Sequence, residues 1–101
     1  MGFTKIGQLS DIPNGAVKVF TVDDRDIAVC NANGSLYAMD NFCSHDDAPL
    51  DQGELDGCEI ECPRHGARFN VENGAVTEGP AVLPLETFEI RVSGDDIEVN
   101  V

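Results

Sequence analysis

The stretch FCSHDDAPLDQGELDGCEIECPRHGARF, residues 42–69, contains both histidines of the chain and three of its four cysteines. A first pair, Cys43 and His45, is separated by sixteen residues from a second pair, Cys62 and His65. Thiolate and imidazole ligands together suit zinc, copper or iron–sulfur clusters. The candidate metal ligands are therefore these four side chains, and each pair supplies one thiol and one imidazole.

The order of the four candidate ligands narrows the choice of metal. A typical zinc finger places its two cysteines together and its two histidines together. The alternation in this chain instead favours two metals held between two loops, one bound by both thiolates and the other by both imidazoles. A [2Fe–2S] cluster with two cysteines on one iron and two histidines on the other fits this description. A structural zinc site made by the same four residues stays open.

The charge of the chain restricts its partners. The 101 residues include 6 basic and 19 acidic side chains, which gives a net charge of −13 and a pI near 4.1. The length predicts a single domain over residues 1–101. The charge argues against nucleic acid and anionic membrane surfaces as partners, because binding to phosphate needs a basic surface. It favours a positively charged protein partner, or simply high solubility.

The sequence contains no recognisable targeting segment. The first residues, MGFTKIGQLSD, lack the cationic start and apolar run of a signal peptide. No apolar run is long enough to span a bilayer. We therefore expect a cytoplasmic monomer with reduced cysteines, in which a cysteine-rich cluster binds metal. The remaining cysteines, Cys30 and Cys58, are expected to be core thiols, because free cysteine behaves as a small buried hydrophobe.

Short strands alternate with glycine-containing turns along the chain. The strands are predicted at residues 16–22, 26–30, 35–39, 57–62, 87–92 and 97–101. Asn33-Gly34 is a two-residue hairpin signal. No segment has a sustained helical period, and at most one short turn is expected within 46–55. This pattern predicts an all-β fold, a small antiparallel sandwich or barrel. Residues 40–69 would form a subdomain inserted in that β body, with two loops joined by a hairpin.

Two short motifs carry a resemblance to a known family. CSH at 43–45 and CPRHGARF at 62–69 resemble the two cluster-binding loops of Rieske-type iron–sulfur proteins. GPAVLPL at 79–85 resembles the third, proline-bearing loop that covers the cluster in those proteins. The resemblance extends over nearly the whole chain and implies one [2Fe–2S] cluster. It also implies that Cys43 and Cys62 hold the inner iron, and that His45 and His65 hold the outer, more exposed iron.

The chain departs from the high-potential respiratory Rieske proteins at four positions. Where those proteins have a disulfide between the loops, this chain has Ala48 and Arg64. Where they have serine and tyrosine hydroxyls that donate to the cluster and its cysteine ligand, it has Ala67 and Phe69. Hydrogen bonds to sulfur raise the potential of a cluster. We therefore expect a potential near the low end of the Rieske range of roughly −150 to +300 mV.

Without these features of the respiratory type, the chain resembles the soluble Rieske ferredoxins of ring-hydroxylating dioxygenase systems. The resemblance implies a one-electron carrier, not itself an enzyme, between a flavin-containing NAD(P)H reductase and a terminal Rieske non-haem iron oxygenase. The sequence contains neither a GxGxxG dinucleotide motif nor a P-loop. Two alternatives stay open: the small Rieske-like subunit of an NADH-dependent nitrite reductase, and a structural zinc module. The expected docking face has an apolar centre with an acidic rim. The centre comprises Ala48, Pro49, Leu50, Pro80 and Ala81, and the rim comprises Asp46, Asp47 and Glu78.

Overall fold

The computed structural model describes residues 2–41, 50, 53–62, 66–78 and 84–100. Within these residues the chain forms three antiparallel sheets and a short 3-10 helix, η1 (Leu9–Asp11). The strands are β1 (Phe3–Gln8), β2 (Val17–Val22), β3 (Arg25–Ala32), β4 (Ser35–Asp40), β5 (Leu55–Asp56), β6 (Glu59–Glu61), β7 (Arg68–Asn70), β8 (Val76–Glu78), β9 (Thr87–Phe88), β10 (Ile90–Ser93) and β11 (Asp96–Asn100). The predicted all-β fold class is confirmed.

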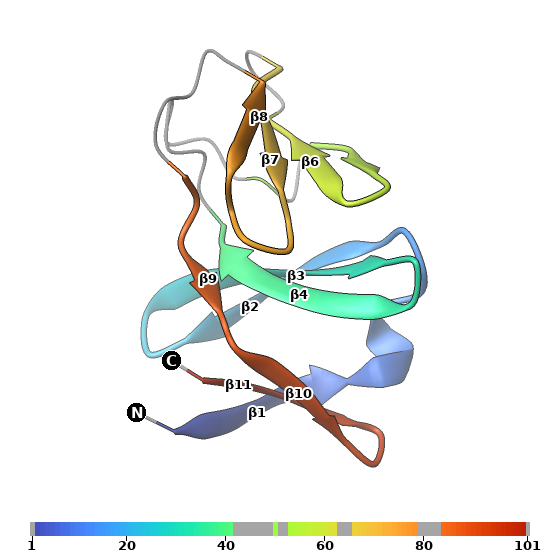
Figure 1. Cartoon of the computed structure of the whole chain (residues 1–101). Helices are drawn as coiled ribbons and strands as arrows, with labels where there is room; N and C mark the ends of the chain where they lie inside the picture. Colours follow the sequence, from blue (N-terminus) through green and yellow to red (C-terminus); the bar gives the residue numbers. More distant parts are fainter. Residues whose placement is uncertain (1, 42–49, 51–52, 63–65, 79–83, 101) are drawn as a thin grey trace.

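The three sheets are stacked as successive layers (Figure 1). The terminal sheet has the strand order β1-β11-β10, the middle sheet β2-β3-β4-β9 and the distal sheet β5-β6-β7-β8. Both termini lie beside the terminal sheet, at the opposite end of the molecule from the distal sheet. The distal sheet runs from Leu55 to Glu78, so the second cysteine–histidine motif falls between two of its strands in the sequence. The sheet extends past residue 69, the expected end of the inserted subdomain.

Strand β3 is buried on both faces because it lies at the centre of this stack. Every residue from Ile27 to Ala32 is buried. Ile27 and Val29 pack with Val99 of β11, in a core between the middle and terminal sheets. Ala28 and Cys30 belong to a second core, between the middle and distal sheets. A strand covered on both sides reads as a continuous apolar run, as IAVC does here.

The hairpins explain the tight connections of the middle sheet. Asn33 and Gly34 join β3 to β4 with φ of 57° and 91°, and Ala32 pairs directly with Ser35. Positive φ at both central residues is the signature of a type I′ turn, whose twist matches that of the strands. The predicted hairpin is therefore confirmed. Asp23 and Asp24 make the same type of connection between β2 and β3, with φ of 50° and 65°, without a glycine.

The prediction of one strand over residues 87–92 is wrong. The segment divides between two sheets at Glu89: Phe88 of β9 pairs with Ala38 in the middle sheet, and Ile90 of β10 pairs with Val99 in the terminal sheet. Phe88 and Ile90 still pack against the same core, so the apolar alternation continues through the change of sheet and hides it. Val92 continues the same alternation, but it is 45% exposed.

Four strands were not predicted from the sequence, namely β1, β5, β7 and β8. Strand β1, FTKIGQ, has no buried residue and is held by pairing with β11, with a register irregularity between Lys5 and Gly7. Strand β5 has two residues, and β7 and β8 have three each. The pairing of β7 with β8 includes a register shift between Arg68 and Phe69. Short strands of this kind are stabilised by tertiary pairing, which local pattern does not reveal.

The turn at Gly74 connects the distal sheet to the segment that returns to the middle sheet. Gly74 has a φ of 76°, and its N–H donates to the carbonyl of Asn70 at 2.7 Å. The Gly74 carbonyl accepts the N–H of Leu85 at 2.8 Å, and Leu85 is buried in the core beneath the distal sheet. A Cβ atom at Gly74 would collide with the Leu85 carbonyl oxygen. Only glycine fits this contact.

We expect Gly74→Ala to lower the free energy of unfolding by more than about 2 kcal/mol. The left-handed backbone costs roughly 1–2 kcal/mol for a residue with a side chain, and overpacking costs a further 1–3 kcal/mol or so. Gly57→Ala is the matched control, because Gly57 has a φ of 61° in the same sheet and no atom within 4 Å of the position that a Cβ atom would take. Urea unfolding followed by circular dichroism compares the two. Equal losses would mean that the approach of Leu85 is unimportant.

Candidate metal centre

Cys62 lies at the end of β6, where the chain turns towards β7, and it is only 1% exposed. The Cys62 N–H donates to the Ala67 carbonyl at 2.7 Å, and the Gly66 N–H donates to the Cys62 carbonyl at 3.1 Å. Gly66 has a φ of 72°, which lets the chain close this connection. The residues that flank the second predicted motif therefore lie on a hydrogen-bonded backbone frame between β6 and β7, the two inner strands of the distal sheet.

The other three predicted ligands, Cys43, His45 and His65, lie outside the described residues. The structure thus places one member of the predicted set, Cys62, and brings it into the core between the middle and distal sheets. Both predicted motifs adjoin described secondary structure. The first follows Asp40 at the end of β4, and the second follows Glu61 at the end of β6.

The environment of Cys62 is apolar. Ala67 and Phe69 are both 0% exposed and belong to the same core as Cys62. These are the positions at which respiratory relatives were expected to carry hydroxyl groups. Since neither side chain has a polar hydrogen, neither can donate a hydrogen bond to a sulfur atom. This packing supports the expected absence of the donors that raise a cluster potential.

Leu50 was expected to contribute to an exposed apolar docking face, and this expectation is wrong. Leu50 is 0% exposed and packs in the core with Ile60 and Met39. A leucine of that size stabilises the fold by about 1.5–3 kcal/mol when it is fully buried. Leu50 therefore helps to attach the first motif to the body of the protein. The other apolar residues of the expected face lie outside the described residues.

The two cysteines outside the motifs are neutral thiols. Cys30 is fully buried on β3, and burial raises its pKa to about 12. Cys58 is partly buried in the turn between β5 and β6 and packs against the same core. A hydrogen bond to the Glu72 carboxylate, together with partial burial, raises the pKa of Cys58. Because metal binding requires the thiol to lose its proton, a raised pKa makes binding less favourable at both residues.

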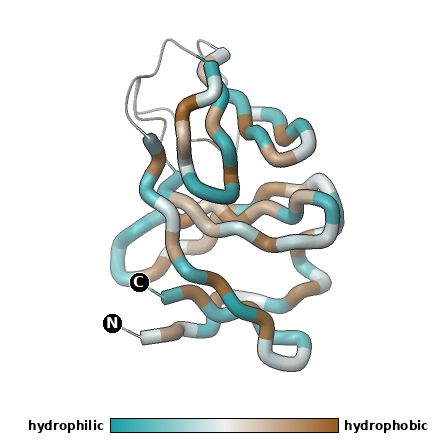
Figure 2. The backbone as a smooth tube through the Cα atoms, in the orientation of Figure 1, coloured by the Kyte–Doolittle hydropathy of each residue, from teal (hydrophilic) through white to brown (hydrophobic). Residues whose placement is uncertain are grey.

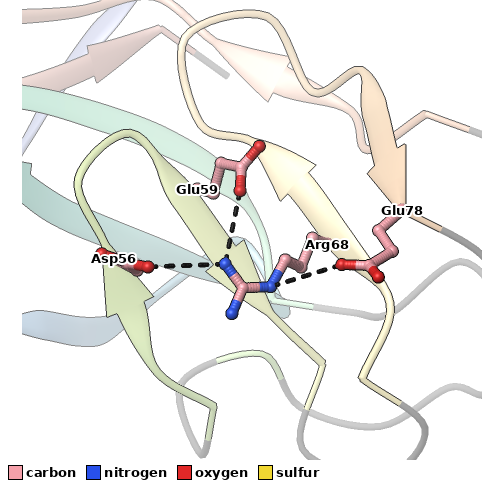
Figure 3. A network of polar contacts seen from close by, with 4 residues as sticks. All are labelled: Asp56, Glu59, Arg68 and Glu78. Atoms are coloured by element: carbon pink, nitrogen blue, oxygen red, sulfur yellow. Dashed lines mark hydrogen bonds and ion pairs between the residues drawn. The ribbon is translucent and has the colours of Figure 1, made fainter.

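Arg68 forms a polar network on the outer face of the distal sheet (Figure 3). Its Nη1 lies 3.4 Å from Glu59 Oε1 and 3.5 Å from Asp56 Oδ2, and its Nε lies 3.7 Å from Glu78 Oε2. One guanidinium therefore contacts side chains from β5, β6 and β8 while it belongs to β7. Hydrogen bonds to Glu59 and Asp56 raise the pKa of Arg68 further above its ordinary value, so its charge is permanent. Sequence reasoning missed this residue, because the nearest carboxylates in the sequence are Glu61 and Glu72 and its three partners come from other strands.

A second set of contacts lies where the chain leaves the middle sheet after β4 and returns to it before β9. The Asp40 N–H donates to the Glu86 carbonyl at 2.9 Å, which joins the departing strand to the returning one. Arg25 bonds the Glu86 carboxylate at 2.9 Å and stacks 5.0 Å from the ring centre of Phe88. Burial raises the pKa of the Asp40 carboxyl, and nearby Arg25 opposes that rise. The chain is thus fixed at the two points where it leaves and re-enters the middle sheet.

Comparison with known proteins identifies the family. A model of the Rieske [2Fe-2S] domain matches residues 2–89. The biphenyl 2,3-dioxygenase ferredoxin component of Rhodococcus jostii is 37% identical over 101 residues, covering 100% of this chain and 94% of the relative. The solved ferredoxin of carbazole 1,9a-dioxygenase from Nocardioides aromaticivorans is 37% identical, with a TM-score of 0.92 over 98% of this chain and 97% of that one. This chain belongs to the Rieske [2Fe–2S] domain family.

Two further structures bear on function. A chain in the complex of reduced oxygenase and oxidized ferredoxin of carbazole 1,9a-dioxygenase is 35% identical, with a TM-score of 0.90 over 96% of this chain and 91% of that one. A putative NADH-dependent nitrite reductase small subunit from Mycobacterium tuberculosis is 20% identical, with a TM-score of 0.85 over 97% and 93%. At that identity the second likeness concerns the fold alone.

The resident cofactor of the family is one [2Fe–2S] cluster, and the donor chemistry of this chain fits it. The four predicted ligands supply two soft thiols and two imidazoles, the set that such a cluster requires. The described thiol, Cys62, is buried beside apolar side chains and held on a frame of two backbone hydrogen bonds. The alternative of a structural zinc module is therefore set aside.

We expect Ala67→Ser and Phe69→Tyr each to raise the midpoint potential, because each adds a donor to the core that contains Cys62. The double variant should raise it further if the two hydroxyls reach different sulfur atoms. Protein-film voltammetry at fixed pH measures the effect. The matched controls are Ala38→Ser and Phe88→Tyr, which change residues in the other core and should leave the potential unchanged. Unchanged or lower potentials for the two test variants, with intact visible spectra, would contradict the role assigned to the missing hydroxyls.

Proposed function

We propose that this protein is the ferredoxin component of a ring-hydroxylating dioxygenase system. It takes single electrons from a flavin-containing NAD(P)H reductase and passes them to a terminal Rieske non-haem iron oxygenase. The observation that carries the proposal is the match over nearly the full chain to proteins named as ferredoxin components of biphenyl and naphthalene dioxygenase systems. The likeness to a chain in an oxygenase–ferredoxin complex supports the oxygenase as one partner.

The proposed ligands are Cys43 and Cys62 on one iron and His45 and His65 on the other. When it is bound, the cluster accepts and releases one electron without forming or breaking a bond in the chain. The part of the protein is to hold the ligands and exclude water from the thiolate side. The burial of Cys62, and the apolar packing of Ala67 beside it, support this division.

The surface of the protein is suited to brief contact with a positively charged partner. Of the five basic side chains in the described residues, four are neutralised by carboxylates. These pairs are Lys5–Asp96, Arg25–Glu86, Arg68 with its three carboxylates, and Arg91–Glu98. With a net charge of −13, little positive charge is left for a phosphate backbone. Charges of this kind act mainly on the rate of association.

We further propose that the protein acts as a monomer in the cytoplasm. Among the described residues, no helix is both long and apolar enough to cross a membrane. The reduced cysteines Cys30 and Cys58 accord with a reducing compartment. The alternative role, as a nitrite reductase small subunit, has no support beyond a shared fold at 17–20% identity.

Substitution of Cys62 tests the ligand set. We expect Cys62→Ala to abolish the visible spectrum and the two irons and two acid-labile sulfides, since one thiolate of the inner iron is lost. Cys30→Ala and Cys58→Ala are the matched controls and should retain the cluster, because both residues lie outside the two motifs and pack with the core. Iron and sulfide analysis with the EPR spectrum of the reduced protein gives the answer. A cluster that survives Cys62→Ala but not Cys58→Ala would overturn the assignment.

Reconstitution tests the function itself. The purified protein is mixed with NADH and with the reductase and terminal oxygenase of a biphenyl dioxygenase system. We expect dihydroxylated product only when this protein is present, and a stopped-flow rate of electron transfer that falls as ionic strength rises. The fall follows because salt screens surface charges over about 10 Å at 0.1 M. A matched reaction replaces the oxygenase with a nitrite reductase large subunit. Nitrite consumption there, without aromatic product in the first reaction, would favour the alternative role.

A further inference from the structure

Among the residues of the distal sheet that the structure describes, negative charge is in excess and Arg68 is the one cation that offsets it. The described residues between 53 and 78 include six carboxylates, namely Glu54, Asp56, Glu59, Glu61, Glu72 and Glu78, and one basic side chain, Arg68. Three of the six carboxylates lie within 3.7 Å of the Arg68 guanidinium, where Figure 3 shows them converging on it from three other strands. Glu61 also contributes to the electrostatic field at Arg68.

Arg68 lies next to the backbone frame of Cys62. Arg68 pairs with Glu61 across β6 and β7, and the following pair is Cys62 with Ala67, joined by the 2.7 Å hydrogen bond. Strand alternation directs neighbouring side chains to opposite faces, so Phe69 lies in the core while Arg68 lies on the outer face. Among the described residues, Arg68 is therefore the cation of the sheet that contains Cys62. Its guanidinium lies on the outer face of this sheet, and the core lies on the other face.

Charges on the distal sheet affect the reduction potential of the cluster. Reduction adds one electron to the cluster, and the chain itself neither gains nor loses a bond or a proton in that step. Carboxylates nearby make the added negative charge less favourable, and a cation makes it more favourable. The Arg68 side chain is only 30% exposed, so solvent screens it less than it screens the 80% exposed side chain of Asp56.

We propose that Arg68 is a positioning residue for electron transfer: its positive charge offsets part of the negative charge of Asp56, Glu59 and Glu78 and thereby raises the reduction potential of the cluster above the value that these carboxylates alone would give. The planar fork of an arginine can contact several carboxylates at once, whereas a lysine is a single point charge. The network also joins all four strands of the distal sheet, which stabilises the frame that holds Cys62. The inference rests on the proposed role of Cys62 as a ligand.

Substitution of Arg68 separates charge from geometry. We expect Arg68→Gln to lower the midpoint potential by a twofold to fivefold change in the equilibrium constant for reduction, which is roughly 20–40 mV at 59 mV per tenfold. Arg68→Lys keeps the charge and should stay near the wild-type potential, while both variants should lose thermal stability. The shift for Arg68→Gln should shrink at high ionic strength. Protein-film voltammetry on the holoprotein measures the potentials.

Two further variants guard the test. Arg91→Gln removes the same charge from an ion pair with Glu98 in the terminal sheet, at 2.6 Å, and should leave the potential unchanged. Glu78→Gln removes one of the carboxylates and should raise the potential. This variant still tests the proposal if Arg68→Gln does not fold. The proposal would be overturned if Arg68→Gln and Arg91→Gln had the same potential. It would also be overturned if Arg68→Lys lowered the potential as much as Arg68→Gln does. Retention of the cluster by Cys62→Ala would instead overturn the ligand assignment, so the two failures are distinguishable.

Discussion

The fold depends on the burial of the middle sheet on both of its faces. Strand β3 supplies Ile27 and Val29 to the core shared with the terminal sheet, and Ala28 and Cys30 to the core shared with the distal sheet. Neither outer sheet has more than four strands, and each needs this central layer to bury its own apolar face. Figure 2 shows the apolar segments of the middle sheet lying between the two outer layers. The frame around Cys62 is therefore built on top of a layer that is itself fixed.

The distal sheet is joined to the body by contacts at its base and along one edge. Asp40 and Glu86 are hydrogen bonded where the chain leaves and returns, and Arg25 adds an ion pair at that point. The backbone N–H of Leu85 donates a hydrogen bond to the Gly74 carbonyl. Leu50, Cys62 and Leu85, which adjoin the three predicted cluster loops, all pack in the core between the middle and distal sheets. A cluster held between loops requires the loops to be fixed relative to one another, because its ligands come from distant parts of the sequence.

Electrostatics links this architecture to electron transfer. An acidic surface keeps the protein soluble and assists its encounter with a basic partner, but it also disfavours the negative charge that arrives with each electron. Arg68 lies where these two demands meet, because its sheet holds Cys62 on one face and carboxylates on the other. The apolar packing of Ala67 and Phe69 acts in the same direction as the carboxylates, since it provides no donor to sulfur.

The sequence by itself determined the all-β class, the Asn33-Gly34 hairpin and the family, because strand alternation, turn chemistry and the spacing of soft ligands are local patterns. It did not reveal that residues 87–92 change sheets at Glu89, since the apolar alternation continues through the change. Strand β1, the burial of Leu50 and the three-carboxylate network of Arg68 were likewise decided by tertiary structure. Each depends on pairing or packing between segments far apart in the chain, where residue type alone does not say which neighbour a side chain will meet.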